Sequence, residues 1–311
     1  MGTVGDVPQE TYREIGARLS NWARWGPDDE RGTTNLITPE RVVAAAALVR
    51  TGKIFDLGIP FASDGPQPGG ARINPVHLMR DTGANQDFPG GFHFTDDYIF
   101  MPLQSASQWD GLSHVYYDDL LYNGYPASDV GPRGATRLAI DKQAKGIAGR
   151  GVLLDIAALK GVEWLDRGYA ITPADLDEAC AKQGVEVGPG DILLFRTGWR
   201  RLFTSTGDAA RFMDGEPGLG LACAEWLRER DVAAVASDNW AIEVLPSEGE
   251  HKFAVHCVLI RDMGMSLGEM LDFEELAADC AADGVYEFFF AGPPIKFALA
   301  VGSPINPLAF K

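Results

Sequence analysis

A chain of 311 residues that is 46% hydrophobic and 23% charged has the composition of a folded globular protein, not of a disordered or fibrous one. Its formal net charge of −17 makes nucleic acid and membrane surfaces unnatural partners, because both carry negative charge themselves. The cysteines are widely spaced, residues 1–18 hold no signal-like apolar run, and no apolar stretch is long enough for a membrane span, so we expect a cytoplasmic protein.

The first third of the chain predicts a helix, two strands and a long loop. Thr38-Pro39-Glu40 begins a helix that runs through Val42 to Val49 and ends at Gly52. Residues 54–57 and 98–103 are β-rich runs that predict strands. Between them, residues 64–91 are rich in Gly, Pro and Asn and predict a long loop, a kind of segment that often carries function. His77 in this loop and His93 just beyond it either line a pocket or lie at the surface.

The rest of the chain continues to alternate between strands and helices. Thr172-Pro173 repeats the helix-start signal, and this helix should run through about Lys182. The β-rich runs that predict further strands are 152–156, 192–196, 232–236, 288–290 and 297–301. Arg196, at the end of one of these strands, is suited either to binding a carboxylate or to a structural ion pair.

The most informative stretch is Gln108-Trp109-Asp110-Gly111-Leu112-Ser113-His114, in which a carboxylate precedes an imidazole by four residues. Histidine is scarce, with five in the whole chain. Carboxylate and imidazole suit Zn or Mn, and side chains four residues apart converge where the backbone turns helically. A buried hydrogen-bonded pair without a metal is the alternative interpretation.

A second group of ligand-type side chains follows downstream. Asp238 comes directly after the predicted strand 232–236, and α/β proteins usually build their sites at such strand ends. Glu243 comes next in the chain. His256 lies in an apolar run and needs a buried partner, either a metal or a backbone carbonyl. Glu269 is also surrounded by apolar residues, where an unpaired carboxylate would be costly.

Taken together, these motifs resemble the cyclase family of metal-dependent hydrolases, the superfamily that includes bacterial kynurenine formamidase and isatin hydrolase. The resemblance begins at Trp25-Gly26-Pro27-Asp28-Asp29 and spans most of the chain. Its further segments, in family order, are 108–114, 151–155, 190–199, 238–243 and 256–269. Several motifs in the same order are more specific than any one of them alone.

The first motif departs from that of the kynurenine formamidase branch, which is His-x-Gly-Thr-His-x-Asp-x-Pro-x-His. Aligning its second histidine with His114 places Asp110 at the first histidine, and Asp can still bind a divalent metal. Tyr116 and Leu120 then stand where the branch has its bridging Asp and its final His, the proposed general acid/base. The chain therefore resembles a subgroup that carries Gln-Trp-Asp-Gly-Leu-Ser-His instead.

The resemblance implies a metal site and a set of catalytic and binding residues. The family's downstream ligands map onto His256 and Glu269, which with Asp110 and His114 would give four ligands for one Zn or Mn ion. The residues with groups suited to general acid/base catalysis are His93, His251, Glu243, Tyr116 and Tyr117. The expected substrate contacts are Gln108, Trp109, Asp238 and Trp240.

The resemblance also implies a fold and an assembly. The expected architecture is α/β with the swivelling β/β/α fold, in which a mixed sheet is layered with helices. A single domain would cover residues 1–311, with an N-terminal helical segment at about 9–52 packed on it. Family members generally form dimers or tetramers, so we expect a homodimer or homotetramer whose partner is a small-molecule substrate.

The expected reaction is hydrolysis, in which a metal-activated water opens a cyclic amide, imide or lactone or cleaves an N-acyl amide. Two alternatives come from other classes of protein. The same metal could stabilise an enolate in a lyase or true cyclase, or the fold could serve as a catalytically silent binding protein.

Overall fold

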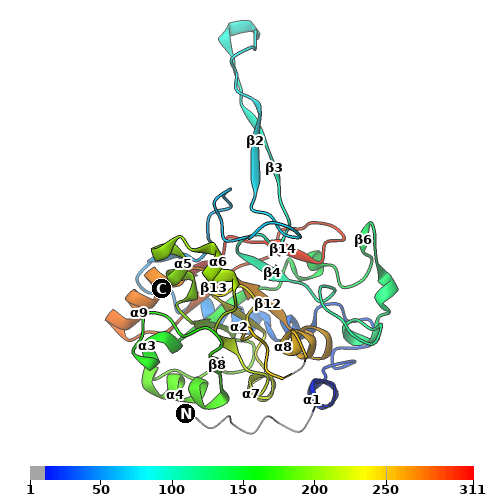
Figure 1. Cartoon of the computed structure of the whole chain (residues 1–311), viewed down its shortest axis with the longest axis vertical. Coiled ribbons are helices and arrows are strands. Elements are labelled where there is room, and N and C mark those ends of the chain that lie inside the picture. The colour runs from blue at the N-terminus through cyan, green and yellow to red at the C-terminus, as the bar shows by residue number, and fades with distance from the viewer. Residues whose placement is uncertain (1–10, 250) are drawn as a thin grey trace.

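The centre of the molecule is a mixed sheet of nine strands, seen in the computed structural model, which describes residues 11–249 and 251–311 (Figure 1). In spatial order the strands are β1 (Ile54–Asp56), β15 (Leu308–Phe310), β13 (Glu287–Ala291), β7 (Ala148–Asp155), β9 (Ile192–Arg196), β11 (Ala234–Ser237), β12 (Ser266–Glu269), β4 (Gln108–Asp110) and β14 (Gly302–Pro304). The four strands from β7 to β12 are parallel, and those on either side of them pair antiparallel. This is the predicted α/β architecture with a mixed sheet.

Both faces of the sheet are buried, because alternate side chains of each strand point to opposite sides. In β7, Val152 and Leu154 belong to one apolar core and Leu153 to the other. Helices α1 (Tyr12–Leu19), α4 (Pro173–Gln183) and α7 (Cys223–Glu229) contribute to the first core, and α9 (Glu274–Asp283) contributes to the second. Burial on both sides explains why β9 is continuously apolar from Ile192 to Phe195.

The two predicted helix starts are confirmed by their capping bonds. Thr38 accepts a hydrogen bond from the backbone of Arg41 at the start of α2 (Pro39–Ala46), which ends three residues earlier than predicted. Thr172 and Asp175 bond to each other's backbone N–H groups at the start of α4. The other helices and helical turns are η1 (Gly32–Leu36), η2 (Pro89–Gly91), η3 (Tyr122–Gly124), η4 (Ala127–Asp129), η5 (Ile140–Gln143), α3 (Ile156–Lys160), α5 (Trp199–Thr206), α6 (Ala209–Met213), α8 (Ala254–His256) and η6 (Cys257–Asp262), which is π-helical.

The N-terminal helices α1 and α2 pack against the layers around the sheet. Helix α1 packs on the first core and against η6, and α2 contacts β7 and β13. Residues 9 and 10 of the predicted N-terminal segment lie outside the described residues. None of the helices in the described part of the chain has the length and apolarity that a membrane span requires.

A two-stranded hairpin projects from the body of the molecule (Figure 1). It is formed by β2 (Val76–Asp81) and β3 (Asp96–Phe100). The prediction of an unstructured loop over 64–91 is therefore wrong in its second half, because His77 and Met79 pair with β3. The strand predicted at 98–103 begins and ends earlier than expected.

One predicted strand, 297–301, is absent from the structure. Ala300 donates a backbone hydrogen bond to Phe297, and Leu299 has a φ of 64°, so the chain turns there and β14 begins only at Gly302. The predicted strands at 54–57, 152–156, 192–196, 232–236 and 288–290 correspond to β1, β7, β9, β11 and β13. The remaining short strands form two pairs, β5 (Val130–Gly131) with β6 (Gly134–Ala135) and β8 (Ala170–Ile171) with β10 (Gly218–Leu219).

Candidate active site

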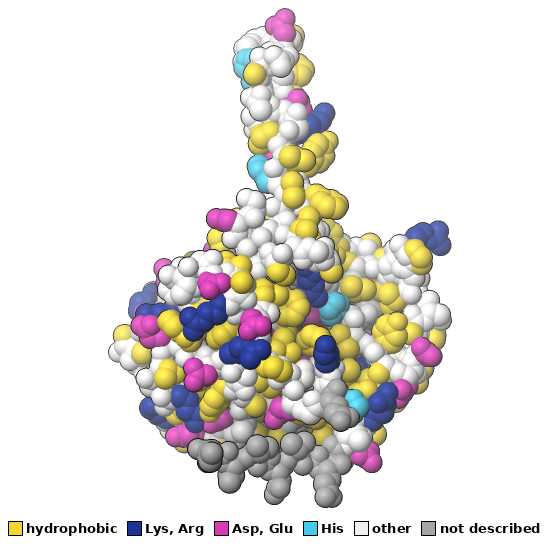
Figure 2. Space-filling model, in the orientation of Figure 1, with side chains coloured by type: hydrophobic (Ala, Val, Ile, Leu, Met, Phe, Trp, Pro, Cys, Tyr) yellow, Lys and Arg dark blue, Asp and Glu magenta, His cyan; other side chains and the backbone are white. Residues whose placement is uncertain are grey.

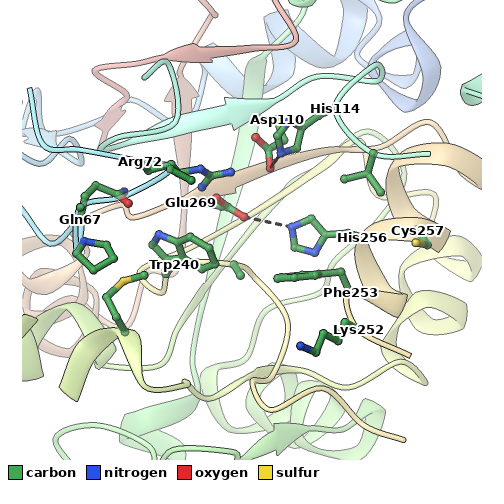
Figure 3. A pocket seen from close by; sticks show the side chains of 16 residues that line it. Gln67, Arg72, Asp110, His114, Trp240, Lys252, Phe253, His256, Cys257 and Glu269 are labelled. Carbon is green, nitrogen blue, oxygen red and sulfur yellow. Dashed lines mark hydrogen bonds and ion pairs between the residues drawn. The ribbon is translucent and has the colours of Figure 1, made fainter. Parts of the chain in front are cut away.

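A pocket of about 570 Å³ opens beside β4 and β12, below the base of the hairpin (Figures 2 and 3). One wall is formed by residues of the segment that precedes β2, such as Arg72. The facing wall is formed by residues in and next to α8, such as Phe253 and His256. The lining residues are Gln67, Pro68, Gly69, Ala71, Arg72, Asp110, His114, Val115, Met213, Trp240, Ala241, Lys252, Phe253, His256, Cys257 and Glu269.

The carboxylates of the pocket are placed by the pairing of β4 with β12. Gln108 lies opposite Glu269, and Asp110 lies two residues further along β4 on the same face. The Gln108 amide Nε2 donates to Glu269 at 2.6 Å and to Asp110 at 3.4 Å, so it links the two acids. Both carboxylates are buried, with 1% and 2% of Asp110 and Glu269 exposed. Burial and the neighbouring Asp110 raise the pKa of Glu269 above its usual value.

His256 faces these carboxylates from the junction of α8 with η6. Its Nε2 lies 3.3 Å from Glu269, and its Nδ1 lies 2.6 Å from Glu243. Glu243 also accepts a hydrogen bond from the backbone N–H of His256, so this acid fixes both the ring and the main chain. Burial favours the neutral imidazole, but the two carboxylates outweigh it and raise the pKa of His256. A metal ion would therefore have to displace a proton from this ring.

His114 lies beside Asp110 on the pocket wall. Its Nε2 is 3.6 Å from the Asp110 carboxylate. Burial lowers the pKa of His114, and the attraction of Asp110 opposes this only in part. His114 is therefore the more readily deprotonated of the two histidines of the pocket, which suits a ring that offers a lone pair to a metal.

The buried side chains fit a divalent metal ion. Asp110, His256 and Glu269 each offer a ligand atom, and these atoms lie within 4.8 Å of one another. Two carboxylates and one imidazole suit Zn or Mn, and His114 is close enough to Asp110 to join them. The Nδ1 of His256 is held by Glu243, an arrangement common for histidines that bind metals through the other nitrogen. Three of the four predicted ligands thus converge, and the fourth, His114, lies beside Asp110.

Three of the residues predicted for acid/base catalysis make contacts other than to the pocket residues named above. His93 is exposed near the end of the hairpin, where its ring bonds to the backbone oxygen of Gly83. His251 packs edge-on against Tyr12, with ring centroids 5.0 Å apart. Tyr117 donates to Asp262 at 2.8 Å, and burial raises the pKa of this phenol. None of the three lines the pocket within a single chain.

The other predicted residues divide between the pocket and its surroundings. Tyr116 is exposed and does not line the pocket. Glu243 hydrogen-bonds to the Nδ1 of His256 and does not itself line the cavity. Asp238 accepts hydrogen bonds from Thr197 and Gly198, which fixes the turn after β9.

Trp109, Gln108, Trp240 and Arg196 are the remaining predicted positions. Trp109 points to the opposite side of the sheet, because it alternates with Gln108 and Asp110, and it is fully buried in the second core. Gln108 contacts the acids without lining the cavity, and Trp240 lines it as predicted. Arg196 pairs with Asp155 and Glu274, so its structural interpretation is confirmed.

The wall formed by Gln67 to Arg72, as well as Phe253 and Lys252, was not predicted from the sequence. The signal available for this wall was the long Gly- and Pro-rich segment, in which Arg72 is a cation within a strongly acidic chain. Three residues with left-handed backbone flank the site: Ile242, Phe253 and Met270, with φ of 57°, 57° and 55°. Such conformations are uncommon for these residue types and often occur at functional sites.

A mixed α/β sheet with a buried cluster of carboxylates and imidazole beside an open pocket defines a class of metal-dependent α/β proteins. Within that class the chain belongs to the cyclase family, because the family model described as "Putative cyclase" matches residues 55–244. A crystal structure described as a novel cyclase is 45% identical with a TM-score of 0.88, and the match covers 94% of this chain and 100% of that one.

More distant structures share the fold. Isatin hydrolase A from Labrenzia aggregata, solved with benzyl benzoate, is 20% identical with a TM-score of 0.61, over 87% of this chain and 97% of that chain. Isatin hydrolase A from Ralstonia solanacearum is 18% identical with a TM-score of 0.62, over 88% and 97% of the two chains. No curated protein matches the chain significantly.

Proposed function

We propose that this chain is a metal-dependent hydrolase that opens a cyclic amide, imide or lactone, or cleaves an N-acyl amide. The observation that carries the proposal is the convergence of Asp110, His256 and Glu269 in the wall of an accessible pocket. The shared fold with isatin hydrolases supports it, since those proteins are named for hydrolysis.

In this proposal Asp110, His256 and Glu269 hold one divalent ion, and His114 completes the set. When bound, the ion supplies Lewis-acid polarisation of a carbonyl group and makes water nucleophilic near neutral pH. Gln108 holds the two carboxylates in place, and Glu243 holds the His256 ring with Nε2 toward them. Trp240, Phe253 and Pro68 give the pocket apolar walls that exclude water around a flat substrate.

A cysteine nucleophile is a poor alternative, although Cys257 lines the pocket. Burial raises the pKa of its thiol to about 12, so the thiolate needed for attack is scarce at neutral pH. Alkylation of the cysteines should therefore leave the hydrolytic activity intact, except where the label on Cys257 blocks the pocket.

The test combines metal analysis with isotope labelling. Purified active protein should contain about one Zn or Mn ion per chain, and turnover in oxygen-18 water should place label in the product carboxylate. Active protein without metal that is indifferent to chelators would contradict the proposal. An unlabelled product would favour the lyase or cyclase alternative, which uses the same pocket without incorporating solvent oxygen.

A further inference from the structure

We propose that Arg72 and Trp240 form an anion-binding subsite in this pocket, and that the substrate is a planar molecule that carries a carboxylate. This inference rests on the proposed function, because it assigns the substrate class of the same site. It concerns a part of the pocket that the metal ligands do not occupy.

Arg72 is a cation without a dedicated partner. It is half-buried in the pocket wall, and it makes no hydrogen bond or ion pair with any residue in the described ranges 11–249 and 251–311. Its guanidinium lies 5.1 Å from the centroid of the Trp240 ring, and in Figure 3 it extends toward the acids of the pocket. A guanidinium that stacks on an aromatic ring keeps the N–H donors around its own edge free.

Trp240 supplies the aromatic surface over which this guanidinium lies. The residue lines the cavity, whereas its indole Nε1 is buried. Arg72 therefore provides the donors in this region of the cavity, and the Trp240 ring holds the guanidinium in place.

The charges of the loaded pocket favour an anion. A divalent ion would neutralise Asp110 and Glu269, which are the carboxylates nearest to Arg72 in the pocket. Arg72 and Lys252 would then form a positive region in a chain whose net charge is −17. A carboxylate matches the forked guanidinium, and a planar ring matches the aromatic side chains of Trp240 and Phe253, which line the pocket.

Calorimetric titration with benzoate and with neutral benzamide tests this subsite, both in metal-loaded and in chelator-treated protein. The variants are Arg72→Met, Arg72→Lys and Trp240→Phe, with Arg133→Met, an exposed arginine outside the pocket, as the matched control. We expect Arg72→Met to weaken benzoate at least about tenfold and to leave benzamide nearly unchanged. Arg72→Lys should recover part of the loss, and Trp240→Phe should lose less than Arg72→Met.

The outcomes separate this inference from the proposed function. Benzoate binding that depends on Arg72 supports the subsite, and where it also survives chelation it does so even if the protein proves not to be a hydrolase. Benzoate binding that requires metal and ignores Arg72 would overturn the subsite, because the carboxylate would then be bound by the ion. Loss of metal from Arg72→Met, or equal weakening by the Arg133 control, would overturn it as well.

Discussion

At the scale of single residues, the site depends on side chains that never face the cavity. Glu243 contacts His256 twice, through the ring and through the backbone, and Gln108 contacts both pocket acids. The carboxylate of Glu243 fixes which imidazole nitrogen is available, because Nδ1 is already occupied. Residues of this kind tune metal affinity without binding the metal themselves.

Replacing Glu243 with Gln should weaken metal binding about tenfold to a hundredfold and leave the fold intact. The amide retains the size of the side chain but loses the charge that makes the imidazole a better ligand. Competition with a chelating indicator measures the affinity, and circular dichroism checks the fold. Glu248→Gln provides a control, since this acid hydrogen-bonds to Leu221 and does not contact His256. Unchanged affinity in Glu243→Gln would show that the contact is structural only.

At the scale of elements, the close approach of strands β12, β4 and β11 places the acids. Gly268 of β12 lies opposite Trp109 of β4 and beside Ala236 of β11. A Cβ at Gly268 would lie 2.6 Å from the Trp109 ring and 2.7 Å from the Ala236 methyl group. Glycine is needed at position 268 because the Trp109 indole already fills the space that a side chain would occupy.

Gly268→Ala should therefore destabilise the protein by about 1–3 kcal/mol through overpacking. Urea unfolding followed by fluorescence measures the change. Gly131→Ala is the control, because a Cβ at Gly131 meets nothing within 4 Å. Equal stability of the two variants would mean that the Trp109 ring moves aside at little cost.

A pH-dependent ion pair joins the N-terminal segment to the connection between α7 and β11. Both carboxylate oxygens of Asp231 accept from Arg24 at 2.7 Å. The hydrogen bonds from Arg24 lower the pKa of Asp231, and burial opposes this less strongly. Because the folded-state pKa is lowered, the contribution to stability is complete above the unfolded-state pKa of about 3.9 and is lost as pH falls through the folded-state value.

Asp231→Asn should then cost up to about 1 kcal/mol at pH 7 and progressively less below about pH 4. Asparagine suits this position because the residue has a φ of 48°, which Asn tolerates well. Unfolding in urea at several pH values, for wild type and variant side by side, measures the difference. A difference that stays constant down to pH 3 would show that the effect comes from geometry and not from charge.

At the scale of the whole molecule, local sequence signals predicted the helices and strands better than the contacts between them. Capping residues such as Thr172 and the apolar runs of β7 and β9 were sufficient to locate helices and central strands. The spacing of Asp110 and His114 suggested a metal pair, whereas His256 and Glu269 were assigned as its further ligands by a family resemblance, because no local pattern places β4 beside β12. Trp109 was misjudged since the side of a strand depends on its partner strand, and the hairpin was missed since its exposed, Gly-rich sequence resembles a loop.

The contact of Gln108 with Glu269 joins strands whose residues are 161 positions apart in the sequence. Such long-range pairings form late in folding, so the donor set is incomplete until the sheet has closed. Metal should therefore slow unfolding and leave the refolding rate unchanged, because its stabilisation is absent from the transition state. At a free metal concentration of 100 times Kd, unfolding should slow by about a hundredfold. Stopped-flow unfolding and refolding with and without Zn measure both rates, and a metal-accelerated refolding rate would place the donor set in the folding nucleus.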